Sequence, residues 1–97
     1  MTGMEKREPP DRLCAAYAEK KVTLTVRALP DDEDVILIEG SPEALEFLGQ
    51  LLLAQAAAAD CGFQLSPTGA GKALFSPAST KGLYIHRLSC TAGPEPK

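Results

Sequence analysis

The chain has 97 residues, of which 44% are hydrophobic and 24% are charged, and its formal net charge is −3 at pH 7. This length allows a single domain with one core. The acidic balance disfavours nucleic acid as a partner, because nucleic-acid-binding domains concentrate basic residues on one face. No apolar stretch reaches the roughly 18 uninterrupted residues of a membrane span. We therefore expect no nucleic acid and no membrane as partners, and the charge favours a basic partner.

The three cysteines, Cys14, Cys61 and Cys90, are odd in number and none lies in a C-x-x-C spacing. This pattern predicts neither a disulfide framework nor a structural zinc site. The N-terminal residues lack the apolar core of a signal peptide. We therefore expect a cytoplasmic location, with all three thiols reduced.

The two ends of the chain are polar and contain proline, which predicts disordered tails over residues 1–11 and 91–97. A single domain would then cover residues 12–90. Residues 11–19 have the pattern of a short helix with Asp11 as its N-cap. A helix this short is marginal in water, so it would form only by packing on another element.

Residues 22–28 alternate strictly between apolar and polar side chains, which predicts a half-buried strand with Thr23, Thr25 and Arg27 outward. A turn over residues 30–34 would connect it to a second strand over residues 35–39, forming a hairpin. The second strand is apolar on both faces. Such a run is typical of a strand that is covered on both sides.

A helix is predicted to begin after Ser41, which can cap it, with Pro42 at its first position and Glu43 near the positive end of its dipole. It would continue to Asp60, with Gly62 as its stop. Apolar residues at helical spacing form a stripe that should face the sheet. That stripe comprises Leu45, Leu48, Leu52, Ala56 and Ala59, and it is widened by Ala44, Phe47 and Leu51.

A short third strand over residues 63–65, a loop over residues 66–82 and a fourth strand over residues 83–88 complete the chain. The predicted fold is α+β, with a four-stranded, mainly antiparallel sheet in β-β-α-β-β order. One long helix packs on one face of this sheet, and a short N-terminal helix is an optional addition.

The stretch SPTGAGKA, residues 66–73, resembles a phosphate-binding loop. The pattern G-x-x-x-x-G-K-[ST] needs glycine where Ser66 stands and a hydroxyl where Ala73 stands. Pro77 also follows too soon for the long helix that the motif requires. A flexible loop with one solvated lysine, Lys72, is the better interpretation.

The remaining polar features predict no catalytic, cofactor or metal site. His86 is the only histidine, and no catalytic constellation surrounds it in the sequence. The acidic run over residues 31–34 lacks the ligand spacing of a calcium loop, so it is either a solvated turn or a patch that meets a basic partner. The candidate partner-binding residues, on this turn and on the open sheet face, are Asp31, Asp32, Glu33, Asp34, Arg27, Tyr84 and His86.

The run EGSPEALEFLGQLLLAQA follows the predicted hairpin and precedes CGFQLS, a Gly/Pro loop and GLYIHRL. Over residues 22–88 this arrangement resembles small immunity proteins of bacterial polymorphic toxin systems, which share a Gly-x-Pro-x-x-Leu helix start and a Leu-rich helix. The resemblance implies a non-enzymatic protein that binds and neutralises a cognate toxin. It assigns no toxin-contacting residue.

Three functions follow from these observations. The first is a protein-binding domain, most concretely an immunity protein that binds a basic toxin domain. The second is a homodimeric structural or regulatory module, joined through the sheet face. The third, a small nucleotide-binding enzyme built on Lys72 and His86, has the weakest support because both motifs are incomplete.

Overall fold

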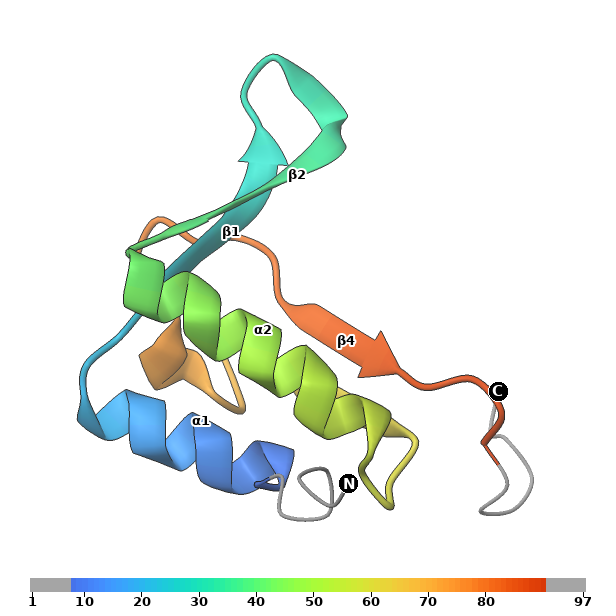
Figure 1. Ribbon diagram of the computed structural model, residues 1–97. Coiled ribbons are helices and arrows are strands. Elements are labelled where there is room, and N and C mark those ends of the chain that lie inside the picture. The colour runs from blue at the N-terminus through green and yellow to red at the C-terminus, as the bar shows by residue number, and fades with distance from the viewer. Residues whose placement is uncertain (1–7, 91–97) are drawn as a thin grey trace.

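The computed structural model describes residues 8–90, so the predicted tail over residues 91–97 and residues 1–7 of the predicted tail over residues 1–11 lie outside the described residues. Pro10 and Asp11, which we assigned to that tail, belong to a helix. Within the described residues, two α-helices, four strands and one 3-10 helix follow one another along the chain (Figure 1). They are α1 (Pro10–Glu19), β1 (Leu24–Leu29), β2 (Asp32–Gly40), α2 (Pro42–Ala56), β3 (Gly62–Leu65), η2 (Lys72–Leu74) and β4 (Leu83–His86). None of the helices within residues 8–90 has the length and apolar character needed to cross a membrane.

The four strands form two separate antiparallel sheets, β1-β2 and β3-β4, so the predicted four-stranded sheet is wrong. The segment 75–81 lies along β1, where a third strand of one continuous sheet would be. It makes a single parallel bridge there, between Leu24 and Phe75. Pro77 has no backbone N–H, so this segment cannot continue a regular ladder.

Irregular hydrogen bonds nevertheless attach this segment to β1. The backbone nitrogens of Ser76 and Thr80 donate to the carbonyl oxygens of Leu24 and Val26, over 2.7 and 2.9 Å. The Oγ of Ser79 accepts from the backbone nitrogen of Val26 over 3.1 Å. The edge of β1 away from β2 is therefore covered by residues 75–81.

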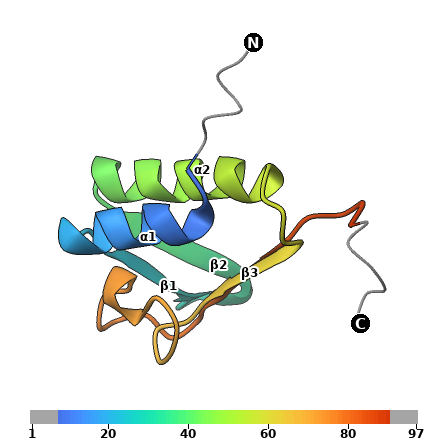
Figure 2. The ribbon, with the colours of Figure 1, turned by 90° about the horizontal axis from the view of Figure 1, so that it is seen from below.

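Two helices lie in one layer over the strands (Figure 2): α2, where we predicted the one long helix, and α1, the short N-terminal helix that the sequence left open. The short helix α1 packs beside α2, and the ring centroids of Tyr17 and Phe47 lie 5.0 Å apart. This contact supplies the packing that a helix of 10 residues needs in order to be stable. Its N-cap is Pro9 and not Asp11, and no side chain caps it.

Helix α2 begins as predicted, because the Oγ of Ser41 accepts from the backbone nitrogen of Ala44 over 3.1 Å. It ends at Ala56, four residues before the predicted end. The predicted stripe is wrong in part, since Leu45 and Leu52 are 46% and 47% exposed. The residues that we expected to widen it, Ala44, Phe47 and Leu51, are buried. Leucines occur on several sides of this helix, and their spacing fits more than one stripe. The buried face consists of Ala44, Phe47, Leu51, Ala54 and Gln55.

One hydrophobic core lies beneath this face of α2 and joins the helix to segments that precede and follow it in the sequence. The first hairpin, the strand β3 and the η2 region all contribute to it. Its buried members are Val22, Leu24, Val26, Ala44, Phe47, Leu51, Leu65, Leu74 and Phe75.

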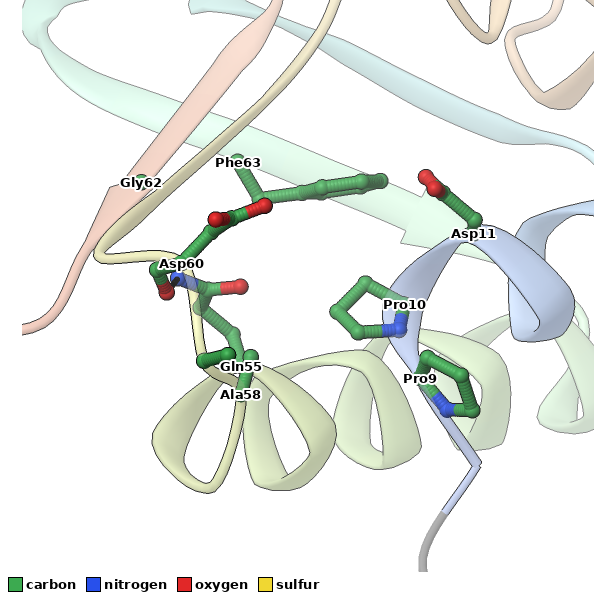
Figure 3. A pocket seen from close by; sticks show the side chains of 9 residues that line it. Pro9, Pro10, Asp11, Gln55, Ala58, Asp60, Gly62 and Phe63 are labelled. Carbon is green, nitrogen blue, oxygen red and sulfur yellow. Dashed lines mark hydrogen bonds between the residues drawn. The ribbon is translucent and has the colours of Figure 1, made fainter.

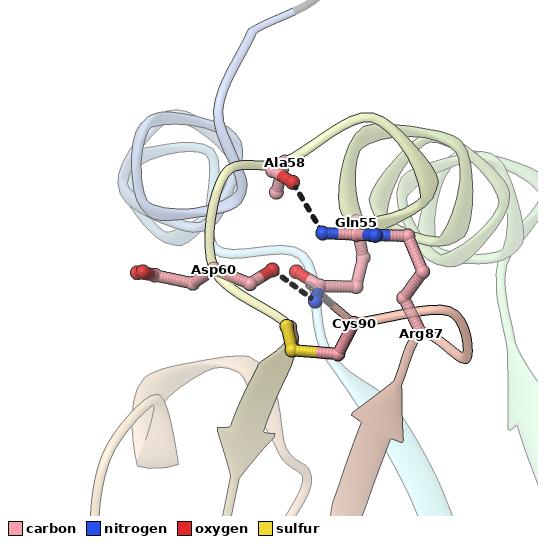
Figure 4. The surroundings of a disulfide bond; sticks show 6 residues. Gln55, Ala58, Asp60, Arg87 and Cys90 are labelled. Atoms are coloured by element: carbon pink, nitrogen blue, oxygen red, sulfur yellow. Dashed lines mark hydrogen bonds between the residues drawn. A yellow bond between two sulfur atoms is a disulfide. The ribbon is translucent and has the colours of Figure 1, made fainter. Parts of the chain in front are cut away.

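A disulfide links Cys61 and Cys90, whose Cα atoms lie 5.7 Å apart (Figure 4). The prediction of three reduced thiols is therefore wrong, and Cys14 is the one free cysteine of residues 8–90. The pairing of β3 with β4 brings the two cysteines together although 29 positions separate them. Disulfides persist mainly in oxidising compartments. The thiols therefore give no reason to expect a cytoplasmic location.

Candidate protein-binding surface

Strand β2 is exposed on both faces, which contradicts the prediction that it is covered on both sides. Val35, Ile36 and Ile38 are 43%, 47% and 39% exposed. The hairpin projects beyond the helices, as Figure 1 shows, so the helix layer does not cover its outer part. An apolar run indicates that a strand needs covering. It does not indicate that the cover belongs to the same chain.

The backbone of β2 has an open edge. Both the N–H and the C=O of Val26 bond to the segment 75–81, on the side of β1 away from β2. Ile38 lies opposite Val26 in the antiparallel register, and Ile36 lies opposite Ala28. Since antiparallel pairs alternate between bonded and non-bonded, the backbone groups of Ile38 and Ile36 point away from β1. Within residues 8–90, β2 pairs with β1 alone.

Acidic residues flank this open edge. The residues 31–34 are all exposed, at the tip of the hairpin. There the Oδ1 of Asp32 accepts from the backbone nitrogen of Asp34 over 3.1 Å, and the register shifts between Ala28 and Leu29. With Glu39, residues 31–40 contain five carboxylates and no basic side chain. The open edge is therefore apolar at its centre and negative at both ends.

The structure divides the predicted partner-binding residues between two places. Arg27 lies on β1 opposite Leu37, is half-buried, and belongs to the same hairpin as the acidic tip. Tyr84 and His86 are exposed on β4, where their rings stack with centroids 6.1 Å apart. The hairpin tip points away from β4 (Figure 1), so the seven residues do not form one surface.

The loop that resembles a phosphate-binding loop lacks the structural context of that motif. Gly71 has a positive φ of 78°, and a Cβ there would collide with the side chain of Leu65. Lys72 is exposed and begins η2, a 3-10 helix of 3 residues, instead of a long helix. Across residues 8–90, no group of three or more His, Cys, Asp or Glu side chains is placed to hold a metal ion.

The free thiol of Cys14 is half-buried in α1, against the core. Burial raises the pKa of Cys14 from its ordinary value of 9.0 to about 11, and the nearby Asp11 carboxylate adds to this effect. The thiol therefore stays protonated at neutral pH. This fits an unreactive thiol, whereas Cys61, which we also expected to be reduced, is in the disulfide.

Two features of the molecule have no counterpart in the sequence predictions: the open edge of β2, and a cavity between α1 and the end of α2. For the open edge, the available signal was that residues 35–39 are apolar on both faces. Nothing in the sequence indicated the cavity, because its walls come from two stretches that lie far apart in the sequence, residues 9–11 and 55–63. No family model, no curated protein and no solved structure matches this chain.

Proposed function

We propose that the protein is a non-enzymatic protein-binding domain, and that a partner binds by adding an extended strand to β2. The observation that supports this most strongly is the open edge, where the backbone N–H and C=O groups of Ile36 and Ile38 point outward. Unpaired edges are templates for strand addition. The exposed apolar side chains beside them would become buried in such a complex.

The charges beside the edge favour a basic partner over a second copy of this chain. Two copies of β2 paired about Ile36 would place Glu33 opposite Glu39 of the other copy. Like charges directly opposite each other destabilise a strand pair. A partner strand with lysine or arginine near its ends would be attracted by the same carboxylates, and this attraction speeds the encounter of the two proteins.

The concrete form of this proposal is an immunity protein that binds and neutralises a basic toxin domain. Its support is the resemblance of residues 22–88, together with a surface that suits a basic partner. The homodimeric module is the second candidate, and it would use the same edge.

The test begins with the genes beside this one. If one of them encodes a toxin domain, that domain is produced and its affinity for the full chain is measured by calorimetry. Ile36→Lys should weaken binding at least tenfold, because it places a charge in the centre of the paired strand. Leu53→Lys is the matched control, since Leu53 on α2 is 49% exposed and Ile36 is 47% exposed.

Equal weakening by the two lysine variants would place the interface on α2 and contradict strand addition. Toxin activity that persists when the intact chain is bound would contradict neutralisation. Dimerisation of the isolated chain, lost in Ile36→Lys, would support the homodimeric module instead.

A further inference from the structure

A cavity of about 200 Å³ opens between the start of α1 and the end of α2, at the end of α2 away from the hairpin (Figures 1 and 3). The rings of Pro9 and Pro10 form one wall, and the ring of Phe63 lies across from them. This volume exceeds the space that a single water molecule takes up. The cavity can therefore hold a small organic group.

One buried hydrogen-bond acceptor in this cavity has no partner. Gln55 is 1% exposed, and its Nε2 donates to the backbone oxygen of Asp60 over 3.1 Å. Its Oε1 is buried and receives no hydrogen bond from any described residue. Figure 3 shows this oxygen pointing into the cavity. Since a buried acceptor without a partner is costly, the cavity favours a ligand that donates a hydrogen bond.

Two carboxylates set the charge of that ligand. Asp60 lies on one side of the cavity and Asp11 on the other, and both residues are exposed. The last carbonyl groups of α2 add the negative end of a helix dipole. Arg87 donates to the carbonyl oxygen of Ala58 over 3.0 Å nearby (Figure 4), but its side chain does not line the cavity. Two negative groups therefore face the space, which favours a cation.

We propose that this cavity binds a guanidinium group. A guanidinium is planar and weakly hydrated, and it carries several N–H donors. It can stack on Phe63 while it donates to the Oε1 of Gln55 and to a carboxylate. An ammonium group is more strongly hydrated and has no flat face to stack. The inference does not rest on strand addition to β2, which lies at the other end of α2.

The test is a titration of the full chain with ethylguanidinium chloride, followed by NMR at the side-chain amide of Gln55 and the ring of Phe63. Ethylurea is the control, because it has nearly the same shape without the charge. We expect saturable shifts with ethylguanidinium and at least tenfold weaker binding of ethylurea. Absence of saturable shifts, or equal binding of the two probes, would overturn the proposal.

Two matched variants locate the site. Asp60→Asn keeps the backbone oxygen that Gln55 needs and removes one carboxylate charge, so it should weaken ethylguanidinium binding at least fivefold. Asp34→Asn makes the same charge change at the hairpin tip and should leave binding unchanged. Equal weakening by both variants would mean that ethylguanidinium binding depends only on the net charge of the protein. That result would contradict a binding site in this cavity.

A further arm identifies the source of the guanidinium. N-acetylarginine amide carries the group on a peptide backbone. Binding at least as tight as that of ethylguanidinium would indicate an arginine side chain of a bound protein. Exclusion of this probe, with ethylguanidinium still bound, would indicate a free small molecule.

Discussion

The two hairpins of this protein are both antiparallel strand pairs, yet one is fastened and the other is open. The β3-β4 pair is tied by the disulfide and by the backbone nitrogen of Arg87, which donates to the oxygen of Cys61 over 2.8 Å. In the β1-β2 pair, β1 is covered on one edge by residues 75–81, while the outer edge of β2 pairs with no strand of the part of the chain that the structure describes. Both hairpins therefore contribute to the fold, but only β3-β4 is cross-linked, and the outer edge of β2 pairs with no strand within residues 8–90.

Removing the disulfide should have the largest effect on stability, because it acts on the fastened hairpin. The double variant Cys61→Ser/Cys90→Ser should lower the free energy of unfolding by about 3.6 kcal/mol, since the bond closes a loop of 29 positions. Chemical denaturation measures this value. A loss below about 1 kcal/mol would show that packing alone holds β3-β4 together. The disulfide would then not distinguish the stability of the two hairpins.

A pair of leucine variants on α2 tests which side of the helix is covered. Leu51→Ala removes a side chain that is 0% exposed, and it should cost about 3 kcal/mol of unfolding free energy. Leu52→Ala, next in sequence but 47% exposed, should cost less than about 0.5 kcal/mol. The same denaturation experiment compares them. A loss for Leu52→Ala as large as that for Leu51→Ala would mean that both leucines are covered, as the sequence predicted.

The free cysteine gives a smaller effect that depends on pH. Because burial raises the pKa of Cys14 from 9.0 to about 11, the folded state favours the protonated thiol. Its contribution to stability is complete below pH 9 and is lost as the pH rises through about 11. Alkylation of Cys14 at pH 8 should be at least tenfold slower in the folded chain than in denaturant. Equal rates would mean that the thiol is solvated, which would contradict its packing against the core.

Local sequence signals predicted the parts of the fold that depend on neighbouring residues. The hairpin, the Ser41 cap and both short strands are confirmed, because alternation and capping act within a few positions. The assembly of the sheets was wrong, since it depends on residues 75–81 lying beside β1, far away in sequence. The disulfide and the cavity were missed for the same reason.

The candidate site was predicted in part. The acidic tip lies where the sequence placed it and is exposed. Tyr84 and His86 were added on the assumption of one continuous sheet, which would have brought them to the same face as Arg27. The sequence predicts a covered strand at Ile36 and Ile38, which are exposed in the structure. The spacing and composition of apolar residues cannot distinguish a strand that its own chain covers from a strand that another protein covers.

Amide hydrogen exchange of the free chain, resolved by residue, tests the open edge most directly. We expect the backbone N–H groups of Leu37 and Glu39, which face β1, to exchange at least tenfold more slowly than those of Ile36 and Ile38. Dilution should leave this alternation unchanged. Slow exchange at Ile36 and Ile38 in the dilute chain would show that β2 already has a partner on its outer edge, and would contradict the account.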